Sequence, residues 1–132
     1  MVLRTQYQVI GPTPVVGGRA TVSAADQESV KEIVKAVAVK MRFEDRTDTS
    51  LVPGTLVRYA QPVRENPMTL IAWVNKGNVV VDFMQESPVL GETEAYRGTK
   101  ETLLLELRRA FGERLVVPAQ KDQASGVAAR TN

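Results

Sequence analysis

The side chains best suited to chemistry in this sequence are an acid, a cation and a phenol, namely Asp82, Arg58 and Tyr59. Asp82 stands out because it is the single acid in the apolar run from Asn78 to Met84. A carboxylate is costly to bury, so an acid in such a setting is a candidate functional group. We keep a small-ligand or enzyme site around these three residues as the alternative hypothesis. The simpler explanation of Asp82 is an exposed acid that keeps a strand soluble.

Two residue types are missing from the chain, cysteine and histidine. Without cysteine there is no disulfide, thiolate metal site or thiol nucleophile, and without histidine there is no imidazole-bound zinc or Ser-His-Asp catalysis. The acidic loop from Arg42 to Ser50 lacks the glycine and the terminal glutamate of an EF-hand calcium loop. We therefore expect no metal, no cofactor and no catalytic residues, and we favour a protein that is not an enzyme.

The stretch from Met68 to Gln85 predicts the central hairpin of a sheet. Two apolar runs flank Lys76-Gly77, and a glycine at this point suits a two-residue loop because it takes a positive φ without steric cost. Such a loop determines which residues lie opposite each other. The predicted pairs are Val74 with Val79, Ala72 with Val81 and Leu70 with Phe83 on one face, and Trp73 with Val80, Ile71 with Asp82 and Thr69 with Met84 on the other.

The second face of this hairpin is the most informative feature of the sequence. It carries four apolar side chains around Asp82, more than a sheet face turned to water usually shows. A tryptophan surrounded by aliphatic side chains is the composition expected at the core of a protein interface. Our leading hypothesis is a small, cofactor-free binding or assembly domain that uses this face for self-association or for a protein partner. The predicted interface residues are Ile71, Trp73, Val80 and Met84.

Two helices and four further strands complete the expected fold. Ser23 with Asp26 predicts the start of one helix, Thr93 predicts the start of another, and Gly112 marks its end. The order of elements predicts an α+β domain, a mainly antiparallel sheet with both helices packed on one face, close to the ferredoxin-like split β-α-β arrangement. The further strands are expected at Leu3 to Ile10, Arg19 to Val22, Thr55 to Gln61 and Leu115 to Pro118.

A chain of 132 residues with 43% hydrophobic and 24% charged residues is expected to form one domain rather than a disordered chain. We place this domain at residues 1–118 and expect a disordered tail at 119–132, because the tail has no periodicity and few large apolar groups. No apolar run is long enough to span a membrane. The first ten residues lack the pattern of a secretory signal, so the cytoplasm is the default location.

The predicted architecture resembles that of the RNA-recognition motif, which binds RNA on an open sheet through aromatic and basic residues. The strand signature of that family, Lys or Arg followed by Gly-aromatic-Gly-aromatic, does not occur between Met68 and Gln85. The net charge of +2 also provides no strong field for nucleic acid. We therefore do not expect nucleic acid as a partner, whereas a small molecule remains part of the alternative hypothesis.

Overall fold

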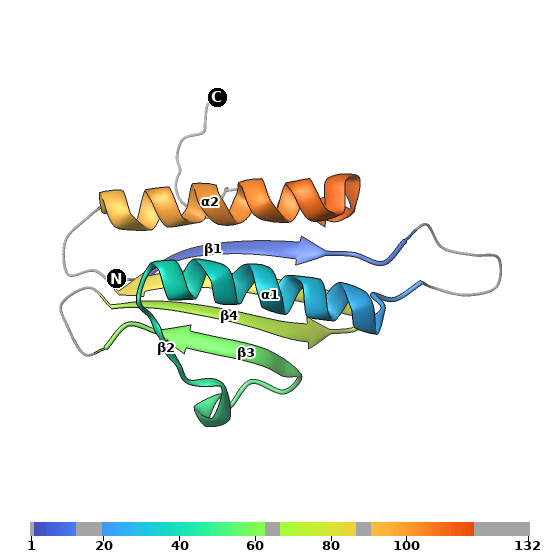
Figure 1. Ribbon diagram of the computed structural model, residues 1–132, viewed down its shortest axis with the longest axis horizontal. Coiled ribbons are helices and arrows are strands. Elements are labelled where there is room, and N and C mark those ends of the chain that lie inside the picture. Colours follow the sequence, from blue (N-terminus) through green and yellow to red (C-terminus); the bar gives the residue numbers. More distant parts are fainter. Residues whose placement is uncertain (1, 13–19, 63–66, 87–90, 118–132) are drawn as a thin grey trace.

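The computed structural model describes residues 2–12, 20–62, 67–86 and 91–117. It is an α+β fold in which six antiparallel strands form one sheet in the order β2-β3-β4-β5-β1-β6 (Figure 1). The elements are β1 (Val2–Val9), α1 (Ala24–Lys40), β2 (Glu44–Asp45), β3 (Thr55–Ala60), β4 (Met68–Asn75), β5 (Asn78–Glu86), α2 (Glu94–Phe111) and β6 (Leu115–Val116), with short 3-10 helices at Thr47–Thr49 and Gly112–Arg114.

Both helices pack on the same face of the sheet, as the sequence predicts. Val30 and Val34 of α1 and Leu103 and Leu107 of α2 are fully buried in one cluster with the strands. The alternation of side chains along each strand sends every second residue into this cluster and the others to the opposite face. The strand residues on the helix side include Tyr7, Val9, Tyr59, Leu70, Ala72, Val79, Val81 and Phe83.

The hairpin of β4 and β5 has the predicted turn. Lys76 and Gly77 have φ angles of 53° and 84°, the positive values that a two-residue hairpin loop requires. All six predicted residue pairs are confirmed by the observed register. The turn chemistry therefore determines which side chains share the face around Trp73.

The three helix ends that the sequence predicts are also confirmed. Ser23 accepts a hydrogen bond from the Asp26 N–H and the Asp26 carboxylate accepts one from the Ser23 N–H, so the capping box is complete. Thr93 caps α2 by accepting a hydrogen bond from the Tyr96 N–H. At the other end Gly112 has a φ of 57° and donates its N–H to the Arg108 carbonyl.

Apart from small shifts in where the strands begin and end, two details of the strands differ from the prediction. Of the strand expected at Arg19 to Val22, residue 19 lies outside the described residues, and residues 20–22 are not a strand. The Val22 N–H donates to the Gly77 carbonyl at 2.9 Å, so this segment contacts the hairpin turn and not a strand edge. In addition, the two-residue strand β2 was not predicted, because Glu44 and Asp45 show no strand pattern of their own.

The end of the predicted domain at Pro118 and the tail predicted for 119–132 lie outside the described residues. The last described strand, β6, pairs with Gln8 and Val9 of β1, while β1 pairs along its whole length with β5. Because both β5 and β6 are antiparallel to β1, they run parallel to each other with β1 between them. Within the described segments no helix has the length and apolar character needed to cross a bilayer.

Candidate functional site

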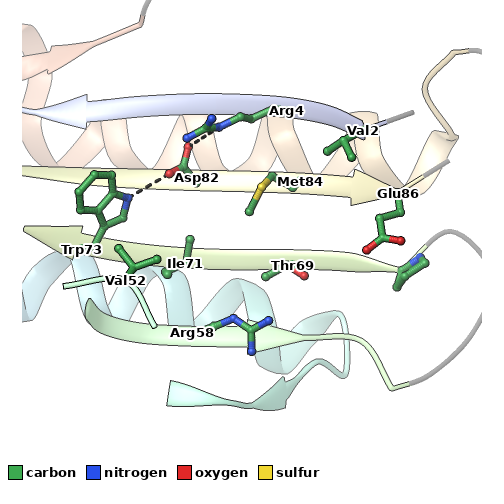
Figure 2. Close-up of a pocket in the computed structure, with 11 residues that line it drawn as sticks. Val2, Arg4, Val52, Arg58, Thr69, Ile71, Trp73, Asp82, Met84 and Glu86 are labelled. Atoms are coloured by element: carbon green, nitrogen blue, oxygen red, sulfur yellow. Dashed lines mark hydrogen bonds and ion pairs between the residues drawn. The ribbon is translucent and has the colours of Figure 1, made fainter. Parts of the chain in front are cut away.

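The face of the sheet opposite the helices is hollowed, and we call this the open face (Figure 2). The hollow has a volume of about 510 Å³. Strands β4 and β5 form its floor, β1 and β3 border it, and the loop before β3 contributes Val52. The side chains that line it are Val2, Arg4, Val52, Arg58, Pro67, Thr69, Ile71, Trp73, Asp82, Met84 and Glu86.

Asp82 is buried on this face, with 3% of its surface exposed. Its Oδ1 accepts hydrogen bonds from Arg4 Nε at 3.1 Å and from Gln6 Nε2 at 2.9 Å. Its Oδ2 accepts from Trp73 Nε1 at 3.0 Å. The interpretation of Asp82 as an exposed, solubilising acid is therefore wrong. The carboxylate is instead satisfied by three donors that compensate for its burial.

The strand register explains why these three donors meet at one carboxylate. Gln6 of β1 lies directly opposite Asp82, while Arg4 lies opposite the next residue on the same face, Met84. On the other side Trp73 pairs with Val80 and reaches Asp82 across the diagonal. Arg4 and Gln6 were not predicted as part of this site, because nothing local to β1 shows that β5 is its neighbour. The sequence feature that could have pointed to these two residues is their alternation with the apolar residues of β1.

The four predicted interface residues all lie on or beneath the open face. Ile71 and Val80 are already buried within the single chain, with 4% and 2% of their surfaces exposed. Trp73 and Met84 are partly exposed, and both line the hollow. The apolar surface of this face is therefore smaller than the sequence predicts. It is extended at its rim by Val2 and Val52, which are 59% and 37% exposed.

The residues of the alternative site are only partly brought together. Arg58 lines the same hollow as Asp82 and pairs with Ile71 in the β3–β4 register. Tyr59, the next residue, points to the opposite face because side chains alternate along a strand, and it is buried in the core. Burial raises the pKa of the Tyr59 phenol, and the charge of Asp45 adds to the effect. The structure therefore separates Tyr59 from the other two residues.

Arg58 is the cation of this face that is not committed to an acid. Its Nη1 donates to the Thr49 hydroxyl at 3.2 Å, and it makes no ion pair with any described residue. Among the described residues, no three acidic side chains gather closely enough to hold a metal ion. The open face thus provides apolar contacts, one indole and one available guanidinium, which is chemistry for binding.

Comparisons with known protein families, with characterised proteins and with solved structures gave no significant match to this chain. The geometry of the open face is therefore the basis for inferring a function.

Proposed function

We propose that this protein is a small non-catalytic binding or assembly domain that uses its open face for self-association or for a protein partner. The observation that carries the proposal is the partly exposed pair Trp73 and Met84 on the sheet face that neither helix covers. Tryptophan and methionine are enriched at protein interfaces, and a tryptophan in a central position often contributes a large share of the binding energy.

The hydrogen bonds of Asp82 support a role in binding more than in catalysis. All three donors around Asp82 point at its two oxygens, so the carboxylate is occupied in holding its neighbours in place. The bond to Nε1 restricts the orientation of the Trp73 ring. A side chain that is ordered before binding loses less conformational entropy when a partner arrives. The network thus prepares the indole as a rigid anchor.

A second candidate function is the binding of a small molecule in the hollow. Its volume of about 510 Å³ falls in the range of roughly 300 to 1,000 Å³ that is usual for ligand sites. Arg58, which has no acidic partner among the described residues, could hold an anionic group of such a ligand. In this version of the alternative site Asp82 orients Trp73 and Arg4, and Tyr59 has no direct part.

The proposal is tested by replacing exposed parts of the open face. Met84→Ser removes a partly exposed apolar side chain, and Trp73→Ser also removes a donor to Asp82. We expect both variants to associate more weakly than the parent, and Trp73→Ser to melt at the lower temperature of the two, because it also loses the hydrogen bond to Asp82. Light scattering across concentration, run beside circular dichroism melts, measures the two effects separately. Val39→Ser is the matched control, because Val39 is 64% exposed on α1.

Two results separate the candidate functions. If the parent associates with itself or with a partner and Met84→Ser does so equally well, the open face is not the interface and the leading proposal is wrong. If the parent is a monomer at every concentration and binds small organic anions in a way that Arg58→Ala abolishes, the small-ligand function is correct instead.

We also propose that the fold is a ferredoxin-like variant. The support is the unit formed by β5, α2 and β6, in which two parallel strands are joined by a helix and separated by β1, as in a split β-α-β arrangement. An experimentally determined structure compared with ferredoxin-like domains would test this assignment.

A further inference from the structure

One leucine of the chain makes almost no contact with its own fold. Leu51 is 96% exposed, and it precedes Val52, which is 37% exposed and lines the hollow of the open face. We call these two residues the Leu51–Val52 tip. Single exposed apolar residues are common on protein surfaces. A fully exposed leucine that directly precedes a residue lining an apolar hollow is a more specific arrangement.

The loop that carries this tip is held in a defined conformation. The Ser50 and Thr55 hydroxyls share a hydrogen bond of 2.7 Å, and the Thr55 hydroxyl also donates to the Val52 carbonyl at 2.6 Å. The Val52 N–H donates to the Ser50 hydroxyl at 3.3 Å. These bonds tie the two sides of the loop together at its base. Leu51 is therefore presented by an ordered loop, which lowers the entropy lost when the tip is buried against a partner.

The loop is also attached to the floor of the open face. The Val74 N–H of β4 donates to the Gly54 carbonyl at 2.9 Å. Gly54 has a φ of +78°, and a Cβ there would lie 2.6 Å from the Val74 carbonyl oxygen, so only glycine allows the loop to approach β4 so closely. The loop that carries the tip is thus joined to β4 at the side of the hollow.

The apolar hollow of the open face therefore has the Leu51–Val52 tip at its rim, where Val52 lines it. In Figure 2 Val52 lies beside Trp73 and Ile71 at one side of the hollow, which continues past Met84 and Thr69. An isologous dimer needs a surface patch that is complementary to itself about a two-fold axis, and a projection beside a depression can meet this requirement. Such an axis would place the tip of each copy over the hollow of the other.

The charges of the open face are compatible with this pairing. The residues that line the hollow include two arginines, Arg4 and Arg58, and two acids, Asp82 and Glu86, so their formal charges sum to zero. Two such faces do not repel each other as faces of one sign would. A strongly acidic or strongly basic partner would find no field of the opposite sign there.

We infer that the partner of the open face is a second copy of this chain, and that the Leu51–Val52 tip of each copy enters the hollow of the other. This inference rests on the proposed function and names its partner. Burying one leucine changes an equilibrium constant by roughly 10- to 100-fold, and a symmetric dimer buries two.

The first experiment measures the dimer dissociation constant of the full chain by sedimentation equilibrium for the parent, Leu51→Ser and Leu105→Ser. Leu105 is the matched control, a leucine that is 56% exposed on α2. We expect Leu51→Ser to raise the dissociation constant about 100-fold or more and Leu105→Ser to leave it unchanged. The melting temperature of dilute Leu51→Ser should equal that of the dilute parent, because Leu51 contributes almost nothing to its own core.

The second experiment uses the absence of cysteine from the chain. Leu51→Cys and Thr69→Cys are mixed and oxidised, and mass spectrometry reports which pairs are linked. Thr69 lines the hollow, so tip insertion predicts a disulfide between the two variants. Leu105→Cys mixed with Thr69→Cys should give none above the background.

The results distinguish the inference from the proposed function. If the parent is a dimer that Met84→Ser weakens but Leu51→Ser does not, tip insertion is wrong and the open face is still the interface. If neither substitution weakens the dimer, both the inference and the proposed function are overturned. If the parent is a monomer at every concentration, the partner is not a second copy and this inference is wrong. The proposed function then requires a different protein as the partner.

Discussion

The indole of Trp73 donates its Nε1–H to Oδ2 of Asp82 at 3.0 Å, across a diagonal of the β4–β5 pairing. Together with Arg4 and Gln6, which bind Oδ1, this bond ties three central strands to one another on the side that no helix covers. A buried carboxylate is stable only when its hydrogen bonds are made, so the network stabilises the open face as a unit.

Replacing Asp82 should therefore destabilise the fold. In Asp82→Ala the three hydrogen bonds to the Asp82 carboxylate are lost, and we expect the free energy of unfolding to fall by about 2 kcal/mol. Urea unfolding followed by tryptophan fluorescence measures this loss, and Trp73 is the only tryptophan of the chain. Asp48→Ala is the control at an exposed acid and should change stability by less than about 0.5 kcal/mol. Equal losses in the two variants would show that the network is not stabilising.

The hairpin turn should be more sensitive to substitution than the end of α2. Gly77 has a φ of +84°, and a Cβ at this position would lie 2.7 Å from Thr21 Cγ2. Gly112 also has a positive φ, but no atom lies within 4 Å of its Cβ position. We expect Gly77→Val to lower the free energy of unfolding by about 3 kcal/mol or more and Gly112→Val by about 1 to 2 kcal/mol. Urea unfolding of both variants checks the order, and equal losses would mean that the Thr21 contact adds nothing.

Acid should remove part of the stability that Asp26 provides. Its hydrogen bond from Arg114 is the main cause that holds the pKa of the Asp26 carboxyl below the ordinary value of 3.8, and the Ser23 backbone N–H adds to this. Because folding lowers the pKa of Asp26, its carboxylate contributes fully to the free energy of unfolding above pH 3.8. This contribution is lost as the pH falls through the folded-state pKa. We expect Asp26→Asn to melt below the parent at pH 7. Melts at lower pH should show this gap closing, and a gap that stays constant would contradict the linkage.

Alkali should destabilise the protein through two buried phenols. Burial raises the pKa of Tyr7 and of Tyr96 to about 12, from an ordinary value of 10.0. Between pH 10.0 and about 12 these two phenols lose their protons in the unfolded chain before they do so in the folded protein. The free energy of unfolding therefore falls as the pH rises. Absorbance titration of the ionised phenols should show both groups titrating late in the folded state.

Tyr96→Phe tests the contribution of one of these phenols. The Tyr96 hydroxyl shares a 2.7 Å hydrogen bond with the Thr5 hydroxyl and donates to the Phe83 carbonyl at 3.1 Å. The variant should therefore be less stable than the parent by about 1 kcal/mol at pH 7. Melts at increasing pH should narrow this difference, because the variant has one phenol fewer to titrate. If the difference in stability does not change with pH, groups other than Tyr96 cause the loss of stability in alkali.

The sequence by itself was sufficient for the elements that local chemistry specifies. The hairpin register follows from Lys76-Gly77, because a two-residue loop with positive φ at both positions allows one pairing. The starts of both helices follow from Ser23 and Thr93, whose side chains accept hydrogen bonds from N–H groups three residues later. These features depend on residues a few positions apart, so no knowledge of the rest of the fold was needed.

Only the tertiary structure decided the environment of Asp82 and the shape of the open face. Arg4 and Gln6 are separated from Asp82 by 78 and 76 positions in the sequence, and they meet it because β1 pairs with β5. Leu51 likewise has no periodic pattern that could mark it, and its exposure beside the hollow depends on how the loop attaches to β4. Pairing between distant strands is determined by the packing of the whole core, because local propensities do not select which strand becomes the neighbour of another.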